Sequence, residues 1–559
     1  MRNFLKIFIA AIAISFLVSS CKNKGGAGSM IPSDAPMVFY ANTKSLLEKY
    51  PYDEFKNEQL FKDIKADSTL PEWAKIIFND PKTSGIDLDK GITFFFAKGT
   101  SNNFNFILEG SVKDASNFEK LNKNLDSSQS VSDEKGLKTF SIHNKAIAVW
   151  NGNNFVYVFN LNSPSIGEFE NQGTDSTTMP SIPFGDLNES KSYAIKLFSL
   201  KKDSSLAKDK RFNDLITEKG DLKIWTNTEG IMNLSPTMGM MSMLKLDALT
   251  KDNRSATNIS FENGSIQGTS KTYYNKELMD LFKKYKPDDI KTDELSKIPS
   301  GDITGVAAIN FKPELLSEIL KITGLDGMVN MGASQLGLTL DDLIGAIDGH
   351  ILFSFSDLKA SFNAPQNIDS KPDINFNFLF KTGIRDQAKF KKIIDAINKL
   401  NGITNSSGIY YNSNDKTFAL SNHKEFANSF LDGKQNNKAD WMNKISGHSG
   451  GVYININKIL SSVNTPSDSI ASAILQKSKA VWNDAFATAN GISDNAITGS
   501  FTVTFMDKNT NSLNILNSYI DQLYQLEKIR KQKEKAGITF APPSDSTAID
   551  NAIPAPDGK

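Results

Sequence analysis

Short apolar runs alternate with amphipathic stretches along most of the chain. The run "ITFFFA" from Ile92 and the run "FNFILEG" from Phe104 have the length and the β-branched and aromatic content that are typical of strands. Asp114 then precedes Phe118 and Leu121, whose spacing places both on one face of a helix that Asp114 can cap. Short connections such as "HNKA" and "NGNN" favour antiparallel hairpins, so the pattern indicates a mixture of strands and helices.

The pattern of the first half returns in the second half. Five blocks recur in the same order, and Asp386 again precedes a helix pattern as a predicted N-cap. The matched blocks are "IPSDAPMVFYANTKSLLEK" at Ile31 with "IPSGDITGVAAINFKPELLSEILK" at Ile298, "GIDLD" at Gly85 with "GLTLD" at Gly337, "FNFILEG" at Phe104 with "FNFLFKTG" at Phe376, "SYAIKLFSL" at Ser192 with "GVYININKIL" at Gly451, and "IQGTSKTYYNKELMDLFKKY" at Ile266 with "ITGSFTVTF" at Ile497. Since chance explains five ordered matches poorly, the sequence predicts a tandem duplication.

Each copy is predicted to be α+β. The whole chain is interpreted as two tandem copies of a mostly antiparallel sheet with helices packed on one face. The predicted segments are a lipoprotein signal peptide at 1–20, a flexible tether at 21–30, the first α+β repeat at 31–285, a charged linker at 286–297, the second α+β repeat at 298–526, and a C-terminal helix end with a disordered tail at 527–559.

The first residues have the pattern of an export signal. Arg2 and Lys6 form a positively charged start. The apolar stretch that follows, residues 7–18, is too short for a membrane-spanning helix of about 20 residues. The sequence that follows, "VSSC", resembles a bacterial lipobox. Cleavage is therefore expected between Ser20 and Cys21, with fatty acyl chains such as palmitate attached to Cys21. The alternative is that Cys21 is an ordinary spare thiol.

The residues after Cys21 bear on the location of the protein. Lys22 and Lys24 stand where surface-displayed lipoproteins of Bacteroidota carry an acidic cluster. Two or three acyl chains hold a protein on a membrane far more firmly than one chain does. The lipobox predicts a lipid-anchored protein, and the difference from those surface lipoproteins implies, by resemblance, the outer membrane with the periplasmic face favoured over the cell surface.

Composition argues against several classes of function. The 63 Lys and Arg balance the 63 Asp and Glu, which leaves no electrostatic footprint for a nucleic-acid partner. Cys21 is the only cysteine, so a disulfide framework and Cys-based metal sites are excluded. The four histidines are scattered without metal-ligand spacing, and no phosphate-binding glycine pattern stands between a strand and a helix. They are His143, His350, His423 and His448. No metal or cofactor is expected.

The stretch "GHSGG" from Gly447 fits G-x-S-x-G, the nucleophile motif of serine hydrolases. In those enzymes a helix follows the serine, whereas "VYINI" after Ser449 alternates like a strand. No histidine follows Ser449 in the chain, and His448 beside it would point to the opposite face of an extended chain. We therefore interpret the motif as a turn and predict no catalytic residue.

Two further features have a chemical and a structural interpretation. Asp87 and Asp89, with Asp341 and Asp342, could serve acid-base chemistry or calcium, but turn and cap roles are favoured because no EF-hand spacing surrounds them. The Met-rich residues 232–243 could line a hydrophobic binding groove or bind Cu(I). Packing is favoured there, because an ordinary amphipathic helix occupies the matching place in the second copy.

The lipobox, "IPSDAPMVFYAN", the "GIDLD" block before "ITFFF" and the duplicated layout resemble a family of large Bacteroidota lipoproteins known only as domain of unknown function 4836. The resemblance implies an envelope location and brings no activity or site residues. The first functional hypothesis is a non-enzymatic, lipid-anchored protein that binds or scaffolds something in the periplasm. The alternatives are an accessory subunit of an outer-membrane assembly or export machine, and a carboxylate-dependent hydrolase of glycans or peptides, which would need a cleft with two facing acids.

Overall fold

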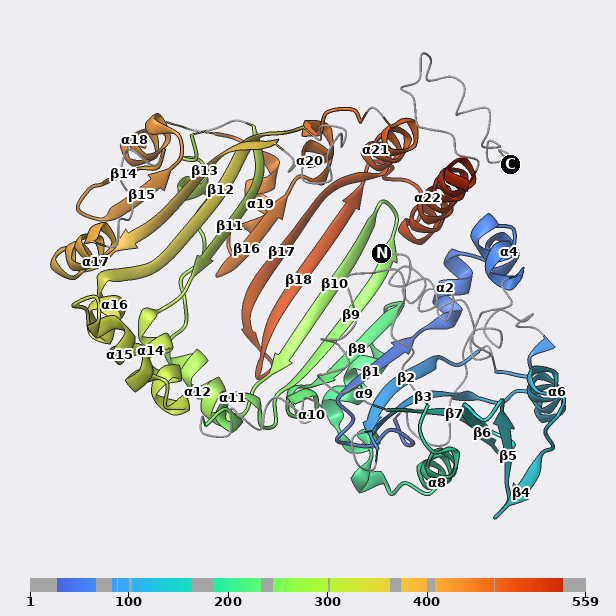
Figure 1. Cartoon of the computed structure of the whole chain (residues 1–559). Coiled ribbons are helices and arrows are strands. Elements are labelled where there is room, and N and C mark those ends of the chain that lie inside the picture. The colour runs from blue at the N-terminus through green and yellow to red at the C-terminus, as the bar shows by residue number, and fades with distance from the viewer. Residues whose placement is uncertain are drawn as a thin grey trace. The chain divides into compact units, whose positions relative to one another are not determined.

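A computed structural model describes residues 28–66, 83–87, 89–99, 103–162, 184–232, 245–299, 302–361, 373–399, 408–433, 435, 437–466 and 468–535. The chain divides into two compact units. The first comprises residues up to 241 together with 250–261 and 268–273, and the second comprises 242–249, 262–267 and 274–559. Figure 1 labels the elements of both. Both units combine helices with antiparallel sheet, which confirms the predicted α+β class.

The elements of the first unit follow the predicted alternation of strands and helices. Its strands, the last two of which lie mostly within it, are β1 (Met37–Ala41), β2 (Ile92–Lys98), β3 (Asn103–Ser111), β4 (Ser132–Glu134), β5 (Leu137–Ile142), β6 (Ala146–Trp150), β7 (Asn154–Asn162), β8 (Leu222–Asn227), β9 (Arg254–Glu262) and β10 (Ser265–Tyr273). Its helices are α2 (Thr43–Lys49), α3 (Tyr52–Phe55), α4 (Gln59–Ala66), α6 (Ala115–Leu125), α8 (Leu187–Phe198), η2 (Lys202–Ser204), η3 (Leu206–Lys208), α9 (Lys210–Thr217) and α10 (Thr228–Met232).

Helices cover both faces of the first unit's sheet, whereas one face was predicted. On one face Ala194 of α8 and Phe212 of α9 pack with the strand residues Val156 and Val158. On the other face Phe118 of α6 lies against the rings of Trp150, Phe155 and Tyr157. The cause is visible in β6, where all five residues are buried, so both of its faces need a cover.

The second unit carries longer strands and more helices. Its strands are β11 (Ile303–Asn310), β12 (Ile347–Ser361), β13 (Asp373–Ile384), β14 (Tyr410–Ser413), β15 (Thr417–Ser421), β16 (Gly450–Ile454), β17 (Trp482–Ser493) and β18 (Ala496–Phe505). Its helices are α11 (Asp247–Thr250, mostly within it), α12 (Lys276–Lys284), α13 (Thr292–Leu295), α14 (Pro313–Thr323), α15 (Asp326–Ser334), α16 (Leu340–Ala346), α17 (Gln387–Lys399), α18 (Lys424–Asp432), α19 (Asp440–Ile445), α20 (Ile456–Ser462), α21 (Ser469–Val481) and α22 (Ser512–Lys535).

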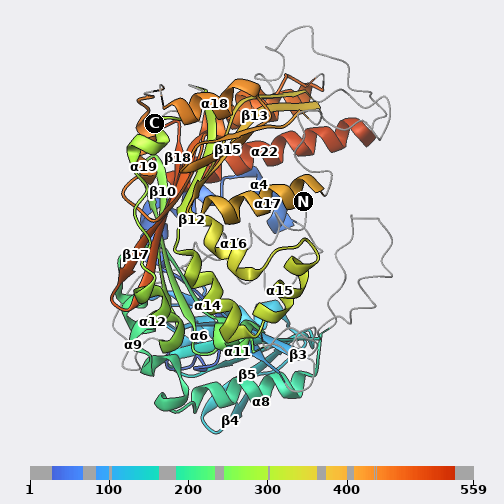
Figure 2. The same ribbon diagram turned by 90° about the vertical axis from the view of Figure 1, so that its left-hand side faces the viewer.

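The core of the second unit lies between its sheet and the helices α13, α18 and α19. Trp441 and Ile445 of α19 pack with Val306 of β11 and Tyr453 of β16. Figure 2 shows α14 to α16 on the opposite side of these strands from α19. In this unit too the helices therefore flank both faces of the sheet.

Local sequence signals account for the helix starts and the hairpins. Asp114 accepts a hydrogen bond from the backbone nitrogen of Asn117 at 2.9 Å, and Asp386 accepts one from Ala388 at 2.9 Å, which confirms both predicted N-caps. The hairpin between β5 and β6 turns through His143 and Asn144, both with positive φ, as the tightest hairpin turns require.

Strand pairing runs in the same order in the two units. In the first, β3 pairs with β2, β2 with β1, β1 with β8 and β8 with β9. In the second, β13 pairs with β12, β12 with β11, β11 with β16 and β16 with β17. Every one of these pairings is antiparallel. The tandem duplication stays a prediction, which this order supports at the level of strand pairing.

One predicted block match is wrong. "SYAIKLFSL" forms most of helix α8, whereas "GVYININKIL" forms β16 and α20. The spacing of the buried residues Ala194 and Leu197 is helical, and Asp186 caps the helix through the backbone nitrogen of Asn188 at 2.8 Å. The strand that occupies the place of β16 in the first unit is β8, whose buried residues alternate along the strand.

The charged segment at 286–297 is not a free linker. It contains α13, and Ile290 and Leu295 are 3% and 0% exposed within the core of the second unit. Met30 at the end of the predicted tether is likewise buried in the core of the first unit. Helix α22 extends to Lys535, so the C-terminal helix end lies after residue 526 as predicted, and the predicted tail lies outside the described residues.

Candidate ligand-binding site

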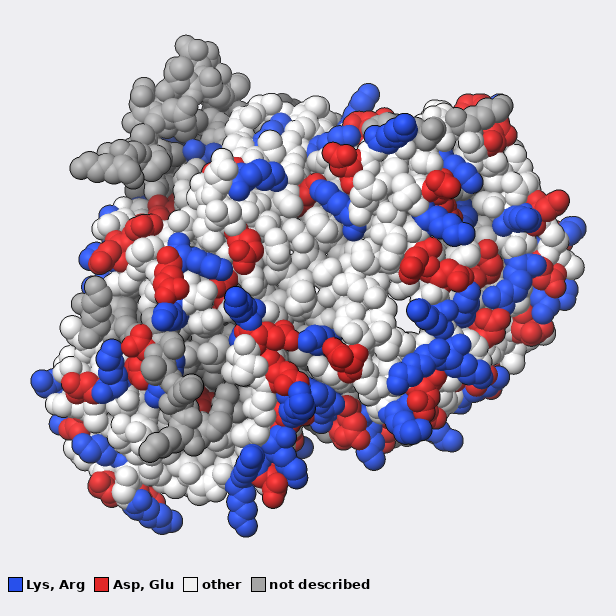
Figure 3. Space-filling view, turned by 180° about the vertical axis from the view of Figure 1, so that it is seen from behind, with Lys and Arg blue, Asp and Glu red and all other residues white. Residues whose placement is uncertain are grey.

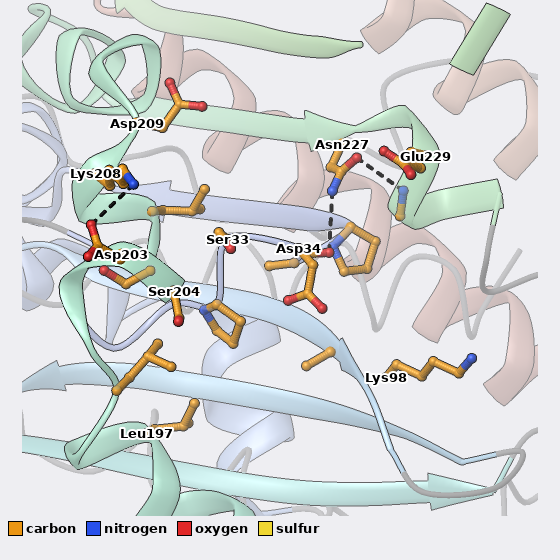
Figure 4. A pocket seen from close by; sticks show the side chains of 18 of the residues that line it. Ser33, Asp34, Lys98, Leu197, Asp203, Ser204, Lys208, Asp209, Asn227 and Glu229 are labelled. Carbon is orange, nitrogen blue, oxygen red and sulfur yellow. Dashed lines mark hydrogen bonds and ion pairs between the residues drawn. The ribbon is translucent and has the colours of Figure 1, made fainter. Parts of the chain in front are cut away.

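A cavity of about 840 Å³ lies within the first unit. Separate segments line it: the loop 32–36, the end of β2, helix α8, the segment 203–209, and the region of β8, α10 and the start of β9 (Figure 4). Its volume is in the range of small-molecule sites in proteins.

Backbone hydrogen bonds fix the loop 32–36 on one side of the cavity. Ser33 donates its backbone N–H to the carbonyl oxygen of Ser204 at 3.0 Å, and Leu206 donates to the carbonyl oxygen of Ile31 at 2.9 Å. The loop is thus hydrogen-bonded to the 203–209 segment, which is distant from it in the sequence.

Asn227 fixes the other side of the same loop. Its side-chain nitrogen donates to the carbonyl oxygen of Asp34 at 3.3 Å, and its side-chain oxygen accepts from the backbone nitrogen of Gly230 at 3.0 Å. Its backbone N–H donates to the carbonyl oxygen of Pro36 at 2.9 Å. In Figure 4 the Asp34 carboxylate points away from Asn227. Because Asn227 is only 2% exposed, these bonds are protected from water and preform the cavity wall.

Several charged groups around the cavity already have partners. Lys208 pairs with Asp203 at 3.1 Å. Arg211 forms two hydrogen bonds with Asp209, at 3.0 and 2.6 Å, and this contact raises the pKa of Arg211. Lys98, which also lines the cavity, makes no ion pair with any residue that the structure describes.

Arg254 is a partly buried cation of the cavity, and the carboxylates of Asp252, Glu229 and Asp209 lie near enough to act on it without forming an ion pair. It is partly buried, and its guanidinium donates to the carbonyl oxygen of Asn253 at 2.9 Å. Within the described ranges it forms no ion pair with a carboxylate. Burial, with the nearby Arg211, lowers the pKa of Arg254 from its usual value. A partly buried guanidinium without a carboxylate partner is a ready binding group for an anion.

The structure places Ser449 in a turn, as predicted. Gly447 has a φ of +76°, and residues 450–454 after the serine form strand β16. The Ser449 hydroxyl donates to the carbonyl oxygen of Ala489 at 3.3 Å. The predicted strand context is therefore confirmed, and the helix of a nucleophile elbow does not follow Ser449.

The predicted acidic candidates lie in turns and caps. Asp87 accepts from the backbone nitrogen of Asp89 at 3.0 Å. Asp342 forms a capping box with Thr339 at the start of α16. Its contacts with Lys392 and Thr339 lower the pKa of Asp342 to about 2, so it stays ionised.

The lipidation site and the Met-rich segment lie almost entirely outside the described residues. Ser20 and Cys21 lie outside the described residues, as does the Met-rich stretch apart from Met232 at the end of α10. Among the residues that are described, no group of three or more His, Cys, Asp or Glu side chains could hold a metal ion. No helix in the same ranges is long and apolar enough to cross a membrane.

Sequence reasoning missed the cavity. Asp34 lies in a block that was recognised only as a repeat, and Asn227 and Arg254 carry no motif. On the face seen in Figure 3, positive and negative side chains are interspersed rather than separated by sign. In the sequence the 63 Lys and Arg balance the 63 Asp and Glu, so net charge gave no signal for the binding group either.

A family model described as "Domain of unknown function (DUF4836)" matches residues 28–178. No curated protein matches the chain. Among solved structures, "Structure of crystal form I of TP0453" is similar at 10% identity and a TM-score of 0.24, covering 46% of this chain and 81% of that one. "Structure of crystal form III of TP0453" has 10% identity and a TM-score of 0.23, covering 47% and 88%. Scores this low support no argument about fold or function.

Proposed function

We propose that the protein is a non-enzymatic, lipid-anchored binding protein of the cell envelope. It is held at the periplasmic face of the outer membrane through Cys21 and binds a small anionic molecule in the cavity of the first unit. The observation that carries the proposal is Arg254, a partly buried cavity cation that forms no ion pair with a carboxylate among the described residues, although Glu229 and Asp209 also line the cavity. Hydrogen bonds between a guanidinium and an anion are about twice as strong as neutral ones.

The cavity supports binding for a second reason. Loop 32–36 is fixed by Ser204 and Asn227 before any ligand arrives, so little conformational entropy is lost on binding. The test is calorimetric titration of the full chain with citrate, glucuronate and glucose-6-phosphate, and comparison with Arg254→Met. The proposal requires that at least one of these anions binds the wild type and that the variant binds it more weakly.

A second candidate is the accessory subunit of an outer-membrane assembly. Apolar side chains on one face of neighbouring strands in the second unit are unusually exposed. Phe353 and Phe376 are 39% and 40% exposed, and Val452 and Ile309 are 41% and 50% exposed. Exposed apolar patches often mark protein interfaces. A photo-crosslinker at Phe353 in intact cells would then capture a membrane protein, while one at Lys424, exposed on α18, would not.

A further inference from the structure

A row of polar side chains crosses four neighbouring strands of the first unit. Glu109 on β3 lies opposite Thr93 on β2, Thr93 opposite Tyr40 on β1, and Tyr40 opposite Lys223 on β8. Alternation along a strand places Tyr40 on the same face as the core residue Val38. This face is mostly apolar, so polar side chains on it need a partner.

A second cavity, of about 490 Å³, lies over part of this row. Tyr40, Thr93 and Glu109 line it from the sheet, and Phe212 and Ile216 line it from α9. The cavity therefore combines two aromatic rings with the carboxyl group of Glu109, and Asp89, Lys44 and Lys90 line it as well.

The ring of Tyr40 is held in place by Gly91. A Cβ atom at position 91 would lie 2.2 Å from Cζ of Tyr40, so only glycine leaves room for the ring. Burial raises the pKa of Tyr40, which keeps its hydroxyl neutral. The ring is thus a fixed wall of the cavity.

Glu109 has no compensating group. Its Oε2 atom is buried and accepts no hydrogen bond from any described residue. Burial raises the pKa of Glu109 to about 7. The other ionisable groups on the elements around the cavity have contacts of their own: Lys44 with Glu48 at 3.9 Å, Lys90 with Asp87 at 3.3 Å, Asp89 with Lys113 at 3.5 Å, and Lys223 with the carbonyl oxygens of Ile216 and Glu218 at 2.5 and 2.6 Å.

In the second unit the position that corresponds to Glu109 is occupied by Lys381. Lys381 lies on β13, opposite Leu352 of β12, which lies opposite Ala308 of β11. Lys381 is 5% exposed, and its ammonium pairs with Glu294. The second unit therefore neutralises its buried charge within the fold, and the first unit leaves Glu109 without a counterpart.

We propose that the cavity between α9 and strands β1 to β3 binds a small molecule through a protonated amine that pairs with Glu109. A carboxylate next to aromatic rings is a chemical environment that favours ammonium groups, because the ammonium forms charge-assisted hydrogen bonds with the carboxylate and packs on the faces of the rings. This site is separate from the Arg254 cavity and does not depend on it.

The test uses 2-phenylethylamine, putrescine and glucosamine, with 2-phenylethanol, 1,4-butanediol and glucose as their hydroxyl counterparts. Each is titrated calorimetrically into the full chain at pH 8, where Glu109 is ionised. At least one amine should bind more than tenfold more tightly than its hydroxyl counterpart. Its affinity should fall as the pH is lowered from 8 to 6, because Glu109 then gains a proton.

Three variants make the test specific. Glu109→Gln keeps the side-chain volume and should weaken amine binding at least tenfold, whereas Glu54→Gln removes an exposed carboxylate of the same unit and should leave binding unchanged. Ile216→Trp fills the cavity from α9 and should also abolish binding, which keeps the test decisive if Glu109→Gln fails to fold. The proposal is overturned if no amine binds the wild type, or if Glu109→Gln binds as well as the wild type. Amine binding should survive Arg254→Met, so this outcome and that of the anion titration are distinguishable.

Discussion

Asn310 donates its backbone N–H to the carbonyl oxygen of Ser449 at 2.7 Å. In the first unit Asn42 makes the same contact with Asp221, also at 2.7 Å. Each contact joins the end of the first strand of a unit to the start of the strand that pairs with it, β11 to β16 and β1 to β8. The backbone of Ser449 therefore helps to fix the sheet. The alignment of "SYAIKLFSL" with "GVYININKIL" predicts the stretch "NESKS", residues 188–192, as the counterpart of the "GHSGG" turn, but the counterpart is the turn before Leu222.

Ser449→Ala should change the free energy of unfolding by no more than about 0.5 kcal/mol. The reason is that the backbone contact with Asn310 remains and only a hydroxyl contact of 3.3 Å with Ala489 is lost. Urea denaturation of both proteins checks this. Labelling of the wild type by a fluorophosphonate probe, absent from the variant, would contradict the assignment as a turn.

Glu109→Gln should alter how stability depends on pH. The pKa of Glu109 is about 7 in the folded protein against 4.5 for an ordinary Glu, so the folded state holds the proton more tightly. The free energy of unfolding of the wild type therefore decreases between about pH 4.5 and pH 7 because of this group. At pH 8 the variant should be more stable than the wild type by about 1–3 kcal/mol, and near pH 4 the difference should disappear.

Urea unfolding at the two pH values measures the effect, with Glu54→Gln as the matched control. Glu54 is exposed in α3, and its loss should change the stability equally little at both pH values. A pH-independent difference between Glu109→Gln and the wild type would show that the Glu109 carboxylate is well solvated in the folded protein.

The effects of substituting Lys381 and Glu294 on the free energy of unfolding should be strongly coupled. Glu294→Gln leaves the ammonium of Lys381, 7% exposed at its side chain, without a counter-charge, and should cost about 2–4 kcal/mol. Lys381→Met should cost less, because the Glu294 side chain is 24% exposed and can be hydrated. The double variant should recover most of the loss. Thermal or urea unfolding of the four proteins gives the coupling energy, and simple additivity of the two losses would contradict a functional ion pair.

Cys21→Ser should prevent lipid attachment, because the thiol accepts the acyl chain. The variant should accumulate as a precursor that retains residues 1–20, visible as a larger mass, and should take up no labelled palmitate. Protease added to intact cells should spare the wild type if it faces the periplasm. A Cys21→Ser protein that is still processed and still fractionates with the outer membrane would contradict the lipoprotein proposal.

The sequence predicted the fold at the level where local patterns decide it. Asp114 and Asp386 were recognised as caps because a short acidic side chain before an apolar helix face satisfies free backbone N–H groups. The stretch around Ala194 was misassigned because its apolar positions fit both a strand and a short helix. The charged residues around Ile290 suggested a linker, yet two apolar residues among them suffice to bury it.

The candidate sites were beyond sequence reasoning for a different reason. Arg254 and Glu109 are ordinary strand residues, and only strand register and packing leave Arg254 without an ion pair and Glu109 without an opposite charge among the described residues. In the recognised repeat, Glu109 of "FNFILEG" aligns with Lys381 of "FNFLFKTG". The sequence alone therefore shows that a negative residue in the first copy is replaced by a positive one in the second. The sequence does not show the consequence of this replacement, because it depends on Glu294. Glu294 lies outside the repeat block and pairs with Lys381 in the second unit.

The most direct test of the proposed function is the anion titration with a series of Arg254 variants. The full wild-type chain should bind at least one of citrate, glucuronate and glucose-6-phosphate. Arg254→Met should weaken that binding about tenfold or more, or about 1.4 kcal/mol, and Arg254→Lys should fall between the two because it keeps the charge and loses the planar fork. Lys202→Gln, an exposed cation that does not line the cavity, should bind like the wild type. If none of the three anions binds, or if Arg254→Met binds as tightly as the wild type, the cavity of the first unit is not the anion site proposed for this protein.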